Sequence, residues 1–114
     1  MGILTNSTVK TQTCIDACNE CAQACYECLQ ACLNESDVDK RIKCISTLNE
    51  CAMMCQMSTS FMSMNAQSSM QHCQLCATVC EKCAQECEMF NDQHCKECAD
   101  ICKKCATECK NMKM

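Results

Sequence analysis

Cysteine is the residue type with the widest chemistry in this sequence, because a thiolate can bind soft metal ions, form disulfides or react as a nucleophile. Nineteen of the 114 residues are cysteines, while the chain has one glycine and no proline. Within four groups along the chain, successive cysteines lie three or four residues apart, with a single gap of seven between Cys44 and Cys51. The candidate metal ligands are Cys14, Cys18, Cys21, Cys25, Cys28, Cys32, Cys44, Cys51, Cys55, Cys73, Cys76, Cys80, Cys83, Cys87, Cys95, Cys98, Cys102, Cys105 and Cys109.

The spacing predicts the kind of element that must carry these thiols. Residues three and four apart share one face of an α-helix and form the inward seam of a helical bundle, whereas a strand needs a period of two. Four cysteine groups therefore predict an all-α fold, an antiparallel up-down four-helix bundle with a Cys-lined core, as a single domain over residues 1–114. The expected helices cover approximately residues 6–33, 37–63, 66–90 and 92–112.

Polar residues between the cysteine groups predict where the helices end. Asn34, Asn65 and Asn91 each follow a periodic segment, and asparagine is second to glycine at the left-handed position that closes a helix. Ser36 stands before an acidic stretch, which indicates the N-cap and first turn of the second helix. Asp92 is expected to cap the last helix in the same way.

Two interpretations of the cysteines need no metal. A cysteine can serve as a small apolar core residue, although nineteen on one seam exceed what packing requires. Disulfides within a helix are strained, because Cβ atoms three or four residues apart are about 5–6 Å apart and a disulfide needs about 3.8 Å. Disulfides between helices remain an alternative under oxidising conditions. A linear thiolate–metal–thiolate unit spans about 4.6 Å, which suits the eight Cys-x-x-x-Cys pairs of this chain.

Charge and ligand softness select among metals. With each thiolate bridging two ions, two-coordinate Cu(I) gives roughly one ion per cysteine and a nearly neutral core, whereas tetrahedral Zn(II) sites leave negative clusters inside the bundle. Thiolates and the thioethers of ten methionines favour Cu(I), so we expect multiple Cu(I) ions. A zinc or mixed soft-metal buffer is the alternative. A further alternative is an iron–sulfur or dithiol electron-transfer protein, although the chain lacks the cysteine motif typical of ferredoxins.

Ligands other than cysteine are expected at the two ends of the bundle. Met62 and Met112 fall at one end, where their thioethers either capture Cu(I) and pass it to the thiolates or fill an irregular core end. His94 directly precedes Cys95 at the other end, where it either ligates an ion or is an exposed side chain at a helix start.

The remaining composition excludes several classes of binding partner. A net charge of −4 with interspersed lysine and glutamate gives no basic face for nucleic acid, and no stretch is apolar enough to cross a bilayer. The first residues carry no apolar run typical of a signal peptide, so we expect a cytoplasmic protein whose thiols stay reduced. No nucleophile–base pair or phosphate-binding loop stands out, and we expect a binding protein rather than an enzyme.

The layout resembles the bacterial cytosolic copper storage proteins, which are Cys-lined four-helix bundles that fill with Cu(I). The resemblance runs from about Thr13 to Cys109 and is most specific in residues 14–32, 73–87 and 94–109. It implies a bundle that is folded before metal binds, Cu(I) held mainly by Cys-x-x-x-Cys pairs, and a homotetramer. We expect copper to be exchanged with a copper chaperone or small thiols. The second helix departs from the pattern, since Leu48 and Ser58 occupy seam positions.

Overall fold

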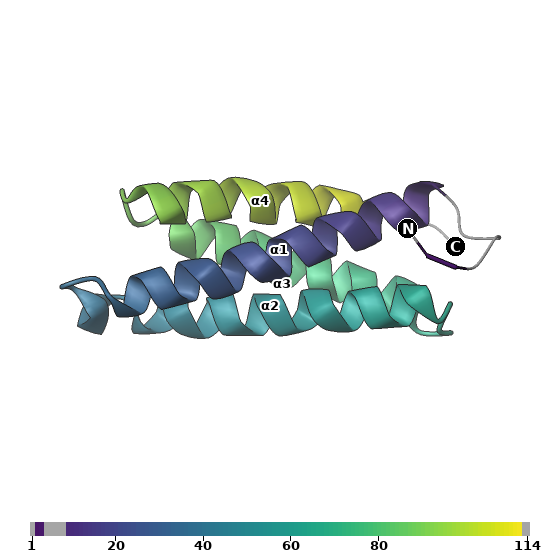
Figure 1. Cartoon of the computed structure of the whole chain (residues 1–114), viewed down its shortest axis with the longest axis horizontal. Helices are drawn as coiled ribbons and strands as arrows, with labels where there is room; N and C mark the ends of the chain where they lie inside the picture. Colours follow the sequence, from purple (N-terminus) through teal and green to yellow (C-terminus); the bar gives the residue numbers. More distant parts are fainter. Residues whose placement is uncertain (1, 4–8, 113–114) are drawn as a thin grey trace.

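The chain folds into four α-helices packed side by side with antiparallel neighbours, as Figure 1 shows for this computed structural model. The structure describes residues 2–3 and 9–112. The predicted all-α four-helix bundle with a Cys-lined core is confirmed. The elements in chain order are α1 (Val9–Leu33), the short 3₁₀ helix η1 (Val38–Lys40), α2 (Ile42–Ser63), α3 (Ser69–Cys87) and α4 (Gln93–Lys110).

The bundle is long and thin, with extents of 48 × 23 × 17 Å. α1 packs on α2 and α4, and α3 packs on the same two helices. Small side chains allow this close approach, because alanines beside the cysteines are buried as well. These are Ala17, Ala22, Ala52, Ala77, Ala84, Ala99 and Ala106. Within the described residues, no helix is both long and apolar enough to cross a membrane.

The helices are shorter than the sequence-based expectation at most of their ends. α2 covers 42–63 rather than 37–63, α3 covers 69–87 rather than 66–90, and α4 covers 93–110 rather than 92–112. The start expected near residue 6 lies outside the described residues, and α1 is helical from Val9. Tight turns with i→i+3 hydrogen bonds replace the expected extra helical turns, as at Phe90, whose N–H donates to the carbonyl of Cys87 at 3.1 Å.

Ser36 and Asp92 do not cap the helices in the way the sequence suggests. The expected N-cap at Ser36 is wrong, because η1 and Arg41 separate this residue from α2. Asp92 is the N-cap residue of α4, but its side chain makes no capping hydrogen bond. Its carboxylate instead accepts from the guanidinium of Arg41, with Nη2 and Oδ1 2.7 Å apart. The ion pair between Arg41 and Asp92 therefore links the connection before α2 to α4, and the capping pattern does not predict it.

Of the three asparagines expected in the left-handed conformation, Asn65 adopts it, with φ of 53°. The prediction is confirmed for this turn between α2 and α3, where the N–H of Asn65 donates to the carbonyl of Met62 at 3.1 Å. It is wrong for Asn34 and Asn91, since no other described residue has a positive φ. Asn34 continues a tight turn, and its N–H donates to the carbonyl of Ala31 at 3.1 Å.

Candidate metal centre

The cysteine side chains form a continuous column of sulfur along the bundle axis, here called the sulfur column. All nineteen cysteines are free and buried, with exposed fractions of 2% or less. The structure thus brings together every cysteine that the sequence singled out. Leu48 and Ser58 stand in the same seam on α2, both fully buried, where the sequence pattern has its gaps in sulfur.

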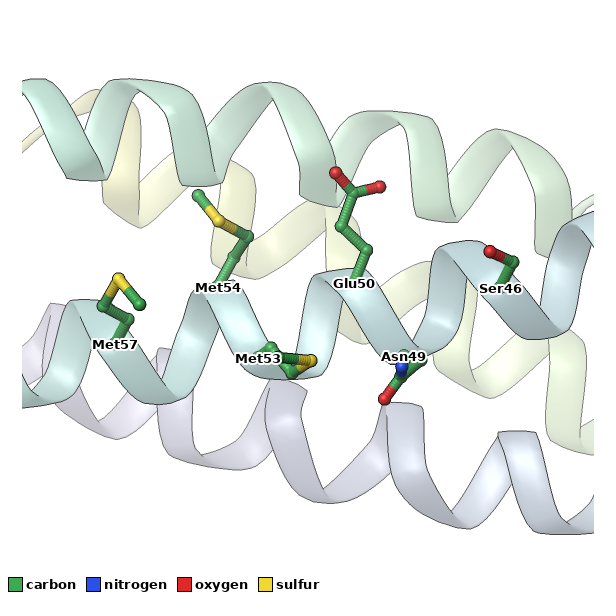
Figure 2. A pocket seen from close by; sticks show the side chains of 6 residues that line it. All are labelled: Ser46, Asn49, Glu50, Met53, Met54 and Met57. Atoms are coloured by element: carbon green, nitrogen blue, oxygen red, sulfur yellow. The ribbon is translucent and has the colours of Figure 1, made fainter.

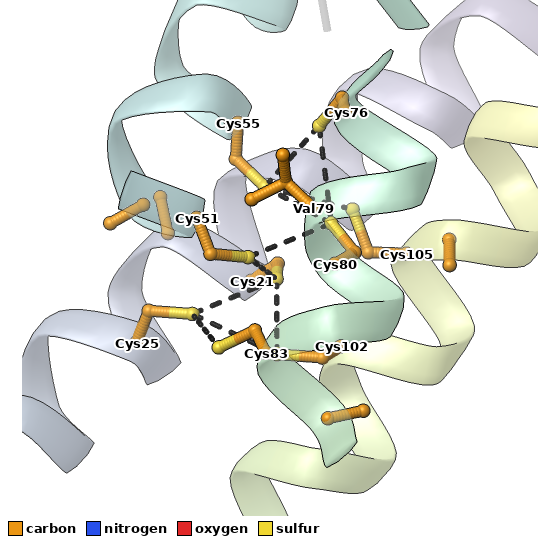
Figure 3. Close-up of a cluster of buried hydrophobic side chains, with 14 of the residues drawn as sticks. Cys21, Cys25, Cys51, Cys55, Cys76, Val79, Cys80, Cys83, Cys102 and Cys105 are labelled. Atoms are coloured by element: carbon orange, nitrogen blue, oxygen red, sulfur yellow. Dashed lines mark hydrogen bonds between the residues drawn. The ribbon is translucent and has the colours of Figure 1, made fainter. Parts of the chain in front are cut away.

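Contacts between helices hold the sulfur column together. Sγ atoms on different helices lie between 3.7 Å, for Cys51 and Cys80, and 4.0 Å, for Cys25 and Cys83. Figure 3 shows these thiols converging from several helices on Cys21 and its neighbours. The sulfur–sulfur bond of a disulfide is about 2.0 Å long. The contacts are therefore between separate thiols, each of which offers a ligand atom.

Two groups of four thiols, which share Cys21, lie near the middle of the sulfur column. In each group all four sulfurs are within 4.8 Å of one another. Ions bound in the two groups would share one bridging thiolate, because a thiolate sulfur can bind more than one soft ion. The groups are Cys21, Cys55, Cys80 and Cys105, and Cys21, Cys25, Cys51 and Cys102.

Some Cys-x-x-x-Cys pairs are closer than a linear metal bridge requires. The Sγ atoms are 3.9 Å apart in the pair 76/80 and 4.0 Å apart in the pairs 21/25 and 98/102. A linear bridge needs about 4.6 Å, so these thiols must rotate apart about χ1 to hold an ion in a linear bridge. The sequence indicated such pairs but not the equally close contacts between helices, because spacing along one helix does not define the register between two.

One end of the sulfur column, here called the charged end, consists of Cys28, Cys32 and Cys95 with His94 and Arg41. His94 Nδ1 lies 3.5 Å from the Sγ of Cys28 and 3.6 Å from that of Cys95. Its Nε2 faces carboxylates, 2.9 Å from Glu35 and 2.8 Å from Asp92. A carboxylate that accepts from Nε2–H leaves the Nδ1 lone pair free, which is the arrangement of histidine ligands in metal sites. His94, Cys28, Cys32 and Cys95 together form a further candidate ligand set.

Arg41 is the residue of the charged end that sequence reasoning missed. Its side chain is only 6% exposed, and Nη1 lies 3.5 Å from the Sγ of Cys32 and 3.6 Å from that of Cys95. Nε donates to Asp37 and Nη2 to Asp92, each at 2.7 Å. Arg41 is the single arginine of the chain, and this is the one signal in the sequence that could have drawn attention to it. Its position outside the cysteine period gave no reason to place it against sulfur.

Ionisation at the charged end follows from burial and the Arg41 ion pairs. The hydrogen bond from Arg41 holds the pKa of the Asp92 carboxyl well below its usual range, and Asp92 in turn raises the pKa of the guanidinium. Burial raises the pKa of the Cys95 thiol, and the neighbouring Asp92 raises it further. Cys95 is therefore a neutral thiol at pH 7 in the empty protein, and a metal ion must displace its proton.

The opposite end of the sulfur column, here called the neutral end, consists of Cys14, Cys73 and Cys109 with Ser58, Met62 and Met112. Met62 and Met112 are 4% and 1% exposed, so both predicted thioether positions close the core rather than stand on the surface. Ser69 beside them is also buried, and its hydroxyl donates to the carbonyl of Ala66 at 2.8 Å. No charged side chain is buried at this end among the described residues.

Comparison with known proteins gives one family and closely similar structures. A sequence profile of the copper storage protein family matches residues 7–114. The Cu(I)-bound form of copper storage protein 3 (Csp3) from Bacillus subtilis is 36% identical and has a TM-score of 0.87, with 90% of this chain and 97% of that chain covered. Comparison with curated proteins gives no match.

A second similar protein comes from Streptomyces lividans and is called a cytosolic copper storage protein. Its structure with five coppers is 36% identical, with a TM-score of 0.86 and 89% of each chain covered. The form loaded with 10 copper equivalents has the same identity and TM-score and covers 89% of this chain and 81% of that chain. The family profile spans nearly the whole sequence and the identity exceeds a third. The chain therefore belongs to the copper storage protein family.

Proposed function

We propose that the protein stores and buffers multiple Cu(I) ions on the thiolates of the sulfur column, at roughly one Cu(I) per cysteine. The observation that carries this proposal is the continuity of the sulfur column, in which thiols on neighbouring helices approach to 3.7–4.0 Å. Each ion can then be held by two thiolates, and each thiolate can reach a second ion. Membership of the copper storage protein family and the Cu(I)-bound state of B. subtilis Csp3 support the choice of metal.

Charge balance supports the proposed stoichiometry. A thiol that binds metal loses its proton, so a core of nineteen ligating thiols would become strongly negative without bound cations. Arg41 is the only charged side chain buried in the described part of the chain, and it cannot balance this charge alone. One monovalent ion per thiolate makes the interior nearly neutral, whereas one Zn(II) per four thiolates leaves two negative charges per site.

His94, Met62 and Met112 are proposed as additional ligands at the two ends. The position of His94 Nδ1 within 3.6 Å of two thiol sulfurs supports its role as a ligand of a terminal ion. The thioethers of Met62 and Met112 are proposed to take up Cu(I) weakly and pass it to Cys14, Cys73 and Cys109. Because both methionines are buried, this step requires their side chains to swing outward.

The proposal extends to cellular role and assembly. A storage role needs no catalytic group, and we propose a non-enzymatic protein in the cytoplasm that exchanges copper with a copper chaperone or small thiols. We also propose a homo-oligomer, a tetramer by the family resemblance. An open groove of about 360 Å³ on the outer face of α2, lined by residues that include Met53, Met54 and Met57, offers an apolar surface for such a contact (Figure 2). The molar mass in solution, measured by light scattering, tests the assembly.

Anaerobic titration with Cu(I) tests the main proposal. The reduced protein is titrated in the presence of a water-soluble Cu(I) chelator such as bathocuproine disulfonate, whose coloured complex reports the copper that the protein has not taken. We expect the chelator to stay uncoloured until roughly one Cu(I) per cysteine has been added, and circular dichroism to show a helical protein before any metal is present. Saturation at a few ions per chain would contradict the proposal.

Zinc storage is the second candidate, and the two groups of four thiols favour it. Neighbouring sulfurs within the groups lie 3.8–4.0 Å apart, for example Cys21 and Cys102 at 3.8 Å, Cys55 and Cys80 at 3.8 Å, and Cys21 and Cys25 at 4.0 Å. A tetrahedral site with metal–sulfur bonds of about 2.3 Å has sulfurs about 3.8 Å apart. Titration with Zn(II) followed by Cu(I) separates the two functions. A zinc store should keep about one Zn(II) per three or four cysteines against a zinc chelator, whereas a copper store should lose that Zn(II) to the chelator before any Cu(I) is added.

A further inference from the structure

Ser58 carries a buried hydroxyl with no hydrogen-bond partner. Its side chain is fully buried, and its Oγ is the single buried side-chain oxygen or nitrogen without a partner among the residues that the structure describes. An unsatisfied buried hydroxyl destabilises a protein, and alanine in the same place would avoid that cost at no loss of packing. Its presence in the seam therefore calls for a partner that the empty protein does not offer.

Other helical hydroxyls show what Ser58 lacks. Several donate to the carbonyl four residues earlier, as Ser60 does to Gln56 and Thr47 to Lys43. The corresponding carbonyl for Ser58 is that of Met54, and it is engaged by His72 Nε2 at 3.0 Å. His72 is held there by its ring contact with Phe61, whose centroid is 4.9 Å away. The arrangement leaves the Ser58 hydroxyl free to donate elsewhere.

The register of the bundle places Ser58 at the level of three thiols. Cys51 pairs with Cys21 of α1 and with Cys80 of α3, and Cys55 pairs with Cys76. One seam step further along α2, the same antiparallel register sets Ser58 level with Cys14 and Cys73. Cys14 in turn contacts Cys109 of α4, with their Sγ atoms 3.9 Å apart. This layer of the neutral end therefore holds three thiols and one hydroxyl.

We propose that the Ser58 hydroxyl is a hydrogen-bond donor for the copper-loaded state, donating to a thiolate sulfur of Cys14, Cys73 or Cys109. A thiolate at the end of the column has an ion on one side only, so it keeps more negative charge than a thiolate that bridges two ions. A hydroxyl is a poor ligand for soft Cu(I) but a good donor to such a sulfur. Arg41 Nη1 already stands in this position at the charged end, 3.5 Å from the Sγ of Cys32.

The inference rests on the proposed function, and substitution of Ser58 by alanine tests it apart from that function. Ser58→Ala should leave the empty protein at least as stable in urea denaturation, because it removes an unsatisfied group. In competition with bathocuproine disulfonate under anaerobic conditions, the weakest-held Cu(I) ions should be released about tenfold more readily than from the unsubstituted protein. The matched control is Ser69→Ala, which removes a buried hydroxyl that already has a partner. It should destabilise the empty protein and leave copper affinity unchanged.

Each outcome decides the proposal. Unchanged copper affinity in Ser58→Ala overturns it, and so does a loss of stability in the empty variant equal to that of Ser69→Ala, since the hydroxyl would then have a partner before copper binds. Failure of the unsubstituted protein to bind Cu(I) would instead overturn the proposed function. Ser58→Thr retains the hydroxyl and should retain the affinity; if its affinity falls as far as that of Ser58→Ala, the hydroxyl is not the cause and the proposal fails.

Discussion

The charged end and the neutral end close the same sulfur column in opposite ways. At the charged end Arg41 is buried against Cys32 and Cys95 and bonded to two carboxylates. At the neutral end Met62 and Met112 fill the core, and Ser58 supplies the one free hydroxyl of the buried described residues. Apart from Leu48, the interior of the column is therefore lined by cysteine sulfur, whereas each end is closed by side chains other than cysteine.

The largest effect is expected from removing the cation of the charged end. Arg41→Met should lower the free energy of unfolding of the empty protein by about 2–3 kcal/mol, because Asp92 would be left partly buried without its counter-charge. Urea denaturation followed by circular dichroism measures this change. Lys103→Met is the control, since Lys103 pairs with Glu88 on the surface and its loss should cost less than about 1 kcal/mol. Equal effects of the two substitutions would mean that Arg41 contributes no more than a surface charge.

Much of the sulfur column could be predicted from the sequence, because its information is periodic. Alternating spacings of three and four placed all nineteen cysteines on inward faces, and all are buried. The spacing also distinguishes a strained disulfide within a helix from a linear metal bridge, because the two need different distances between cysteines.

The ends of the column could not be predicted in this way, because they depend on contacts between distant segments. Arg41 reaches Asp92, which lies 51 residues later in the chain, and no local pattern records this pair. Likewise the missing partner of Ser58 depends on His72 occupying the Met54 carbonyl from another helix. The capping pattern predicts that the Asp92 side chain accepts from the backbone of α4, whereas it accepts from Arg41.

The histidine of the charged end should contribute a smaller, local effect on copper. His94→Gln keeps a polar side chain but removes the imidazole, so a terminal Cu(I) at Cys28 and Cys95 should be held about tenfold more weakly. Competition with bathocuproine disulfonate during the last stage of loading measures this loss. Gln93→Ala is the control, because Gln93 lies beside His94 at the start of α4 and its exposed side chain donates to Glu97. Equal affinity of the two variants would remove His94 from the ligand set.

The methionines of the neutral end should affect rate rather than capacity. Replacing Met62 and Met112 by leucine preserves volume, so stability should change by less than about 1.5 kcal/mol. If the thioethers carry Cu(I) into the column, uptake measured by stopped-flow absorbance should slow by about threefold, with the final copper count unchanged. Met53→Leu with Met57→Leu changes two exposed methionines of α2 as a control. Unchanged uptake in the Met62 and Met112 variant would mean that these side chains only fill the core end.

The smallest expected effect concerns how Arg41 is held in place. Its guanidinium carbon lies 4.3 Å from the centroid of the Phe90 ring, which adds a cation–π contact to the two ion pairs. A double-mutant cycle of Phe90→Leu and Arg41→Met, measured by urea denaturation, should give a coupling energy of about 0.5 kcal/mol. The carboxylates account for most of the position of Arg41 because they bind three of its N–H groups. A coupling energy of zero would mean that the carboxylates alone position Arg41 and that the Phe90 ring contributes only apolar packing at the charged end.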